Sequence, residues 1–227
     1  MNARPQAAAG GTPIERAALA RQELLAAGLR IFAEKGYAAA STREICEAAG
    51  VNAAAIHYHF GDKEGLYRAV LEQPIVELAE RFAGFDAPEL ELEEALRRFL
   101  GVFLPRADEG EALQLATRLH LREMVEPTAA FRELIERSVR PHHEALVRLI
   151  ARHVDAPHPD AALHQLALAL VAMTHDHCQS RHFIETLAPE VYACADAQSQ
   201  VLERLVGYGR ALVDHERARR DALRSPA

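Results

Sequence analysis

The sequence contains no apolar run that approaches the roughly twenty residues needed to cross a membrane as a helix. Its first residues also lack the hydrophobic core of a secretory signal peptide. Cysteine is scarce and widely spaced, since only Cys46, Cys178 and Cys194 are present, which fits reduced thiols better than a disulfide framework. We therefore expect a cytoplasmic protein that does not bind membranes.

Motifs that build enzyme sites in helical proteins are missing as well. There is no Glu-x-x-His pair of the carboxylate-bridged di-iron type, no His-Glu-x-x-His and no glycine-rich phosphate loop. These absences argue against a catalytic helical bundle, which remains the alternative from another function class. We expect no enzyme activity and no cofactor.

The N-terminal third lacks the cationic excess of a nonspecific nucleic-acid binder. Up to Glu72 we count 8 Lys and Arg against 8 Asp and Glu, so the whole net charge of −7 lies in the rest of the chain. Binding by counterion release alone needs a cationic face. Any affinity of this region for DNA must therefore come from a few placed contacts.

Helical periodicity runs through the chain, and no alternating strand pattern appears. The sequence predicts an all-α fold, with a kink or a break at Pro141 because proline disrupts a helix interior. The expected helices span about 15–34, 42–48, 53–59, 63–82, 89–104, 109–124, 128–153, 160–186 and 190–220.

The most informative segment runs from residue 41 to residue 60 and predicts two short helices joined by a glycine turn. Ser41 and Glu44 have the spacing of a capping box, which would start the first helix. Gly50 can take a positive φ and end that helix. Asn52 is a strong N-cap residue for the second helix. This is the arrangement of a DNA-reading helix-turn-helix.

The second short helix has an inner and an outer side. Ile56 and Phe60 lie four residues apart and would face inward with Val51. Three alanines at its leading end, residues 53–55, suit entry into a major groove, where an alanine methyl can touch a thymine methyl. Lys63 opens the following helix, whose positive N-terminus favours phosphate.

Three blocks of sequence resemble the N-terminal domain of TetR-type transcriptional regulators. They are RQELLAAGLRIFAEKGY (21–37), STREI followed by AGV (41–51), and HYHFGDKEGLY (57–67). The resemblance covers the first third of the chain and implies a three-helix DNA-binding domain, followed by a helical ligand-binding and dimerisation domain. In that family, effector binding spreads the two DNA-binding domains of a dimer so that they leave the operator.

The resemblance also assigns residues and domains. We expect a disordered arm over 1–13, the helix-turn-helix domain over 14–72, and the effector-binding and dimerisation domain over 73–222. Relatives usually carry polar residues where the three alanines stand, so base reading is expected to lean on methyl contacts, Arg43 and DNA shape. The expected DNA-facing residues are Thr42, Arg43, Asn52, Ala53, Ala54, Ala55, His57, Tyr58, His59 and Lys63.

The last two long helices are expected to form a homodimer, which a palindromic operator requires. Two such helices from each chain would make a four-helix bundle, and the alternative is that they pack only within their own chain. The apolar stripes expected to face the partner contain Leu163, Leu166, Leu170, Met173 and His177, and Val201, Leu205, Tyr208 and Leu212.

The segments 121–131 and 139–142 resemble, more weakly, the C-terminal domain of CecR-like members of the family. We predict a repressor that binds a double-stranded palindromic operator and is released by a small organic effector. Small-molecule pockets combine apolar lining with a few polar handles. The residues expected to supply them are Arg118, His120, Met124, Phe131, His143, Met173 and His177.

A metal-sensing repressor is the alternative for the sensing step. His175, Cys178 and His182 fall at i, i+3 and i+7 on one helical stripe, so with one further ligand they could bind zinc or copper. Histidines hydrogen-bonded in a polar seam between helices are the commoner outcome. The organic effector is therefore the preferred hypothesis.

Overall fold

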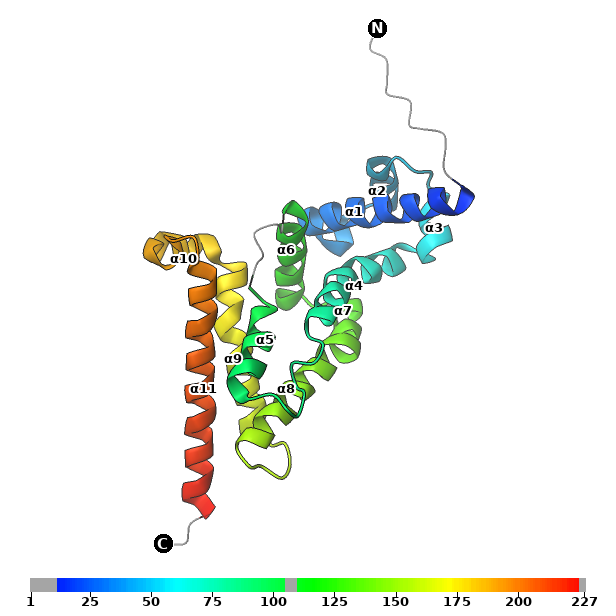
Figure 1. The fold of residues 1–227 in the computed structure, drawn as a ribbon. Coiled ribbons are helices and arrows are strands. Elements are labelled where there is room, and N and C mark those ends of the chain that lie inside the picture. Colours follow the sequence, from blue (N-terminus) through cyan, green and yellow to red (C-terminus); the bar gives the residue numbers. More distant parts are fainter. Residues whose placement is uncertain (1–11, 105–109, 225–227) are drawn as a thin grey trace. The chain divides into compact units, whose positions relative to one another are not determined.

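A computed structural model describes residues 12–104 and 110–224, apart from the side chains of Glu77, Asp176, Cys178 and Gln179. The regular elements in these ranges are all helices, as the sequence predicted (Figure 1). In chain order they are α1 (Pro13–Ala39), α2 (Thr42–Ala49), α3 (Ala54–Phe60), α4 (Lys63–Arg81), α5 (Leu92–Gly101), α6 (Glu111–Val125), α7 (Ala129–Leu134), the π-helix η1 (Ile135–Val139), α8 (Arg140–His153), α9 (Ala161–Gln179), α10 (Arg181–Leu187), the 3₁₀-helix η2 (Pro189–Tyr192) and α11 (Ala197–Arg224).

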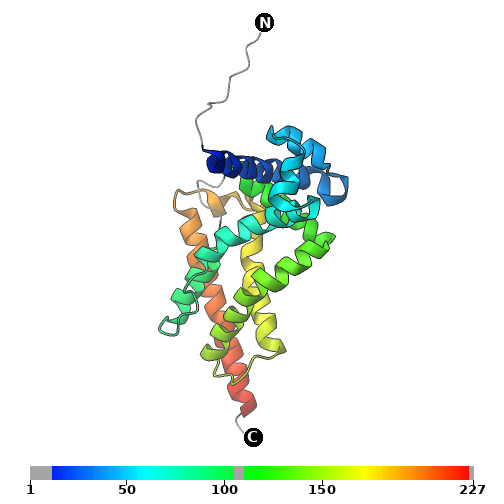
Figure 2. The ribbon, with the colours of Figure 1, turned by 90° about the vertical axis from the view of Figure 1, so that its right-hand side faces the viewer.

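The chain divides into two compact units. The first unit comprises residues 1–74 and 110–132, and the second comprises residues 75–109 and 133–227. Helix α6 belongs to the first unit because it packs against α1, next to which it lies in both ribbon views (Figures 1 and 2). This grouping differs from the expected boundary at residue 72, and the assignment of effector binding to residues 73–222 stays a prediction.

Helix α1 begins two residues earlier than predicted. The Thr12 hydroxyl accepts a hydrogen bond from the Glu15 N–H (3.2 Å), and the Glu15 carboxylate accepts one from the Thr12 N–H (2.6 Å). Pro13 fits the first turn, where no backbone donor is needed. The expectation of a disordered arm is therefore wrong for residues 12 and 13, and residues 1–11 lie outside the described part. Gly36, with φ 77°, interrupts the helix close to its predicted end.

In the second unit, α5, α8, α9 and α11 surround one apolar core. Each completely buried aliphatic side chain contributes roughly 1.5–3 kcal/mol relative to leaving it in water. The side chains with no exposed surface include Leu96, Leu100, Leu146, Leu149, Ile150, Leu163 and Leu170. This core explains the helical periodicity of the C-terminal half.

The predicted helix over 128–153 is three elements. Pro141 has no N–H and cannot continue the backbone hydrogen bonds of an α-helix. Just before it the helix widens into a π-turn, in which the Arg140 N–H donates to the Ile135 carbonyl. Proline then occupies the first turn of α8, where it is tolerated. The expected break at Pro141 is thus confirmed.

Two further helices differ from the prediction. The helix expected over 160–186 ends at Gln179, and α10 follows after Ser180. The helix expected over 190–220 starts as η2, while α11 begins only at Ala197. Both differences lie at element ends, where local sequence signals are weakest.

The stripes expected to face a partner are largely internal. Leu163, Leu170, Val201 and Leu205 are buried in the core of their own unit, so the expectation that they line a dimer interface is wrong. The physical reason is that these side chains are already covered by other helices of the same chain, so they have no apolar surface left for a partner. Tyr208 and Leu212 of the expected set are exposed. They belong to a second, exposed stripe, which consists of Leu168, Ala169, Ala172, Gly207, Tyr208, Ala211 and Leu212.

Candidate nucleic-acid interface

The turn between α2 and α3 is made by Gly50, as predicted. Gly50 adopts φ 68° and ψ 23°, a left-handed conformation that glycine takes without a Cβ penalty. Its N–H donates to the Glu47 carbonyl (3.3 Å), and the Val51 N–H donates to the Cys46 carbonyl (3.0 Å). These bonds close the end of α2 and direct the chain into α3.

The start of α2 is different from the prediction. Ser41 precedes the helix in an extended conformation, but its side chain makes no capping bond. The Glu44 carboxylate instead accepts a hydrogen bond from the Lys35 ammonium (2.5 Å). The expected capping box is therefore wrong, because an ion pair with another helix takes the carboxylate that would have reached back.

Asn52 caps α3, as predicted, although the helix begins at Ala54 and not at Ala53. The Asn52 side-chain oxygen accepts a hydrogen bond from the Ala54 N–H (2.6 Å), and its backbone carbonyl accepts one from the Ala55 N–H (3.0 Å). The cap satisfies donors that α3 would otherwise leave open. It fixes the leading end of a helix that is too short to be stable alone.

The inner side of the motif anchors both helices. Ile45, Cys46 and Ile56 are each at most 3% exposed. Phe60 is half-buried, and the Arg21 guanidinium of α1 lies 5.3 Å from the centre of its ring. Burial raises the pKa of the Cys46 thiol, which keeps it protonated and unreactive. The inward roles predicted for Ile56 and Phe60 fit this packing.

The predicted DNA-facing residues fall into two groups by exposure. Ala55, His59 and Lys63 are half-buried. The exposed group consists of Thr42, Arg43, Asn52, Ala53, Ala54, His57 and Tyr58. The structure thus brings the members of the set together on one compact motif, and their contact with DNA stays a prediction.

Several of the polar side chains are held by neighbours. The Arg43 Nε donates to Glu47 (2.8 Å), and this hydrogen bond is the main reason why the Arg43 pKa is raised. The His57 Nδ1 lies 2.6 Å from the Gly61 carbonyl oxygen. Since a carbonyl can only accept, Nδ1 carries the proton and Nε2 is left as the acceptor nitrogen of the neutral ring. Both side chains are therefore oriented before any ligand arrives.

Lys63 has a partner that sequence reasoning missed. Its ammonium nitrogen lies 4.6 Å from the centre of the Tyr37 ring and donates a long hydrogen bond to the Ala38 carbonyl (3.4 Å). A cation over an aromatic face is attracted by the ring quadrupole. No local pattern in the sequence reveals this pair, because Tyr37 and Lys63 are brought together only by the fold.

The residues expected to bind an effector lie in both units. In the first unit, the His120 and Phe131 rings are in edge-to-face contact (centroids 5.3 Å apart), and Met124 is exposed. Arg118 is exposed on α6. These contacts place the four side chains on α6 and α7, and their role in effector binding stays a prediction.

The other three expected effector residues belong to the second unit. His143 Nε2 lies 2.9 Å from His164 Nδ1, and His177 Nδ1 lies 2.8 Å from the Tyr192 hydroxyl. Met173 is partly buried against the apolar core. Histidines engaged with neighbouring side chains are the outcome that sequence reasoning regarded as the commoner one.

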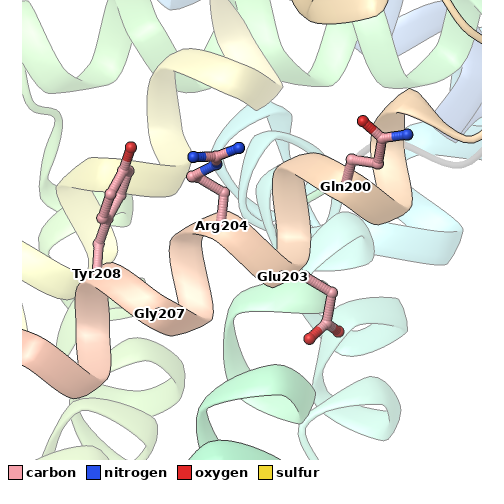
Figure 3. A pocket seen from close by; sticks show the side chains of 5 residues that line it. All are labelled: Gln200, Glu203, Arg204, Gly207 and Tyr208. Carbon is pink, nitrogen blue, oxygen red and sulfur yellow. The ribbon is translucent and has the colours of Figure 1, made fainter.

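Each unit carries a hollow on the surface of its described residues. That of the second unit, about 480 Å³, is lined by Gln200, Glu203, Arg204, Gly207 and Tyr208 of α11. Figure 3 shows the side chains of Gln200, Arg204 and Tyr208 projecting from one side of that helix, opposite Glu203. The hollow of the first unit, about 590 Å³, lies along α1 and α6. Neither contains a residue of the predicted effector set.

The metal hypothesis gains no support in the described residues. They contain no group of three or more His, Cys, Asp or Glu side chains placed to hold a metal ion. Cys178, one of the three expected ligands, lies outside the described side chains. His175 packs against the Phe103 ring, with centroids 5.9 Å apart. Within the same part of the chain, no helix has the length and apolar character to span a membrane.

Two family models match the chain. Residues 24–70 match the model of the TetR family of bacterial regulatory proteins. Residues 92–207, about half of the chain, match the C-terminal domain of the HTH-type transcriptional dual regulator CecR. The first match contains α2 and α3 together with the Tyr37 and Lys63 pair.

Individual proteins agree with these matches. CecR of Shigella flexneri is 35% identical over 143 residues, which cover 58% of this chain and 63% of CecR. The repressor AcnR of Corynebacterium glutamicum is 42% identical over 73 residues, which cover 32% of this chain and 37% of AcnR. The chain thus spans less than two thirds of the length of either curated relative.

A solved structure of similar fold is that of a transcriptional regulator from Pseudomonas aeruginosa PAO1. It has a TM-score of 0.62 and 20% identity, and the match covers 92% of this chain and 93% of that protein. At this identity the likeness shows the fold. Together with the two family models, it establishes that the chain belongs to the TetR family of bacterial transcriptional regulators, which are not enzymes.

Proposed function

We propose that this regulator is a homodimeric repressor that binds a palindromic operator with the α2–α3 motif of each protomer. The observation that carries the proposal is the leading end of α3, where small exposed side chains stand on a rigid turn. Ala53 and Ala54 are exposed, and the Gly50 turn and the Asn52 cap fix the backbone around them. Such an end can approach the floor of a major groove closely.

The flanks of the motif supply polar groups for the DNA backbone. Tyr58 is 79% exposed, and its ring is in edge contact with the His59 ring, with centroids 4.8 Å apart. Arg43 and Lys63 add positive charge at either end of the motif. Contacts of this kind orient the protein on the duplex, whereas base edges and groove shape give specificity.

The exposed apolar stripe of the second unit supports the homodimer. Leu168 and Tyr208 are each more than half exposed, and α9 and α11 pack against each other. An apolar stripe on two neighbouring helices is most simply covered by the same stripe of a second copy, as in a two-fold interface. Two recognition motifs related in this way would meet the two halves of a palindrome.

The dimer has a direct test. Tyr208→Glu places a carboxylate within the stripe, so we expect the protein to sediment as a monomer and to lose operator binding. The control is Leu223→Glu, because Leu223 is an exposed apolar residue near the end of α11. Analytical ultracentrifugation measures both variants, and a Tyr208→Glu protein that remains dimeric would contradict this interface.

For the sensing step, we propose a small organic effector and repression as the output. The relative AcnR is named a transcriptional repressor, which supports repression as the output, whereas the relative CecR is named a dual regulator. The second unit offers half-buried aromatic rings at the edge of its core, since Phe82 lies 5.5 Å from Phe103 and 4.7 Å from His142 between ring centroids. Rings of this kind suit a flat or apolar molecule.

The operator-binding proposal is tested by selection of duplexes from a random-sequence library with the purified protein. We expect a palindromic sequence to be enriched. Ala54→Glu should abolish binding to the selected duplex, because it sets a carboxylate against the bases. Ala26→Glu is the matched control, since Ala26 is exposed in the middle of α1. Equal gel shifts for the two variants would contradict the assignment of α3 as the reading helix.

A further inference from the structure

A buried carboxylate lies in the first unit, away from the predicted DNA-facing residues. Glu123 of α6 is 1% exposed. One carboxylate oxygen accepts a hydrogen bond from the Tyr67 hydroxyl, and the other accepts from the N–H (2.8 Å) and the hydroxyl (3.0 Å) of Thr128. A buried carboxylate is tolerated only while such donors stay in place. Glu123 therefore ties α4 to the corner between α6 and α7.

The Tyr67 hydroxyl is a permanent donor in this arrangement. Tyr67 is fully buried in α4, and its pKa is raised, first by burial and then by the hydrogen bond to Glu123. The raised pKa keeps the phenol in its protonated, hydrogen-bond-donating form. The bond has a fixed direction, from α4 to α6, and fixes the position of the Tyr67 ring.

The same ring continues toward the DNA-binding residues. The Tyr67 and Tyr37 ring centroids are 4.8 Å apart, and the Lys63 ammonium lies 4.6 Å from the Tyr37 centroid. Phe32 packs edge-on against Tyr67 at 4.7 Å. Glu123, Tyr67, Tyr37 and Lys63 therefore form an unbroken line of contacts within the first unit, which we call the Glu123 line.

A second contact attaches α6 to the same end of α1. An Arg122 guanidinium nitrogen donates a long hydrogen bond to the Glu34 carbonyl (3.4 Å). The Arg122 side chain also lies against Gly36, where a Cβ would come within 3.0 Å of it. The segment that presents Tyr37 is thus held from the side of α6 as well.

We propose that Glu123 is a positioning residue for operator binding, which sets the place of the Lys63 ammonium through Tyr67 and Tyr37. The inference rests on the proposed function, in which Lys63 contacts a DNA phosphate. Thr128 leads directly into α7, and the chain enters the second unit after Arg132. A displacement of α7 therefore acts on the same carboxylate and changes the phosphate contact made by Lys63.

The test uses the full-length protein and the duplex selected with it. Glu123→Gln keeps the shape of the side chain but weakens its hydrogen bonds, so we expect operator affinity to fall roughly threefold to thirtyfold. The salt dependence should fall too, since each lost phosphate contact lowers the slope of log affinity against log salt by about 0.9. Glu126→Gln, at an exposed position of the adjoining turn, is the control that should change neither quantity.

A double-mutant cycle separates positioning from a general effect on the fold. In a Lys63→Ala background, Glu123→Gln should have little further effect on affinity or on the salt slope, because the contact that it positions is already gone. If Glu123→Gln weakens binding equally in both backgrounds, the positioning role is wrong.

A second variant keeps the test decisive if Glu123→Gln unfolds. Tyr67→Phe removes only the hydroxyl, and circular dichroism melting reports whether the fold is retained. An unchanged salt slope in folded Tyr67→Phe protein would overturn the inference. Failure of the wild type to select any duplex would instead overturn the proposed function, so the two failures are distinguishable.

Discussion

Both units have buried apolar side chains, but they differ in what their buried carboxylates bind. In the first unit, a directional bond between Tyr67 and the buried Glu123 joins two helices. In the second, α5, α8, α9 and α11 share a continuous apolar core, and the buried Glu216 pairs with Arg219 and Arg220 of its own helix. Apolar burial is non-directional, whereas a buried hydrogen bond specifies one geometry. The unit that carries the reading helix is therefore the one in which a buried carboxylate fixes the position of one helix relative to another.

The largest effect is expected from a cavity in the second unit. Leu146 has no exposed surface, so Leu146→Ala should lower the free energy of unfolding by about 2–5 kcal/mol. Urea denaturation measures the loss. The control is Leu223→Ala, because Leu223 is mostly exposed and its truncation should cost far less. Similar losses for the two variants would show that the core does not dominate this unit.

A smaller effect on stability is expected from removing one capping bond in the first unit. Asn52→Ala removes the side-chain acceptor that caps α3 and should cost about 1 kcal/mol of unfolding free energy. Ser41→Ala is the matched control, because Ser41 precedes α2 without a capping bond. Calorimetric melting of both variants tests the pair, and a Ser41→Ala loss as large as that of Asn52→Ala would contradict the observed caps.

The smallest effect is a pH dependence of the second unit. Burial, and then the proximity of His164, lower the pKa of His143 below its usual 6.5. The unfolded chain therefore takes up this proton more readily than the folded chain. The stability that His143 contributes is present above pH 6.5 and is lost as the pH falls through the lowered pKa. Arg140 opposes protonation of His143 as well, while Glu144 favours it.

This pH dependence is checked by the melting temperature between pH 7.5 and pH 5.5. We expect the melting temperature of the wild type to decrease more between pH 7.5 and pH 5.5 than that of the His143→Gln variant. Parallel curves for the two proteins would show that His143 does not carry the effect. The result also locates acid sensitivity in the unit that lacks the Glu123 line.

The sequence predicted the parts of the fold that depend on local chemistry. Gly50 was expected to make the turn because of its backbone freedom, and Asn52 was expected to cap the next helix. The Ser41 and Glu44 capping box failed because Lys35, on another helix, competes for the Glu44 carboxylate. Local patterns give no information about such a competitor, which only the tertiary fold brings close.

Two other features were beyond the reach of sequence reasoning for the same reason. A glutamate in a helical pattern is normally expected in solvent, so Glu123 gave no sign that it would be buried against Tyr67. Both α9 and α11 carry more than one apolar stripe, and periodicity alone does not show which of them packs inside the chain. The buried stripe contains Leu163 and Leu205, and the exposed one contains Leu168 and Tyr208.

The buried thiol of Cys46 can be used to measure how often α2 opens locally. Cys46 is buried on the inner side of α2 itself, whereas Cys194 of the second unit is exposed. Because Cys46 is only 3% exposed, we expect an alkylating reagent to react with it mainly when α2 opens locally, so the modification rate reports this opening. The measurement uses a variant whose Cys194 and Cys178 are replaced by serine. Added operator duplex should slow the alkylation of Cys46, and the degree of slowing would measure how strongly bound DNA suppresses the local opening of α2.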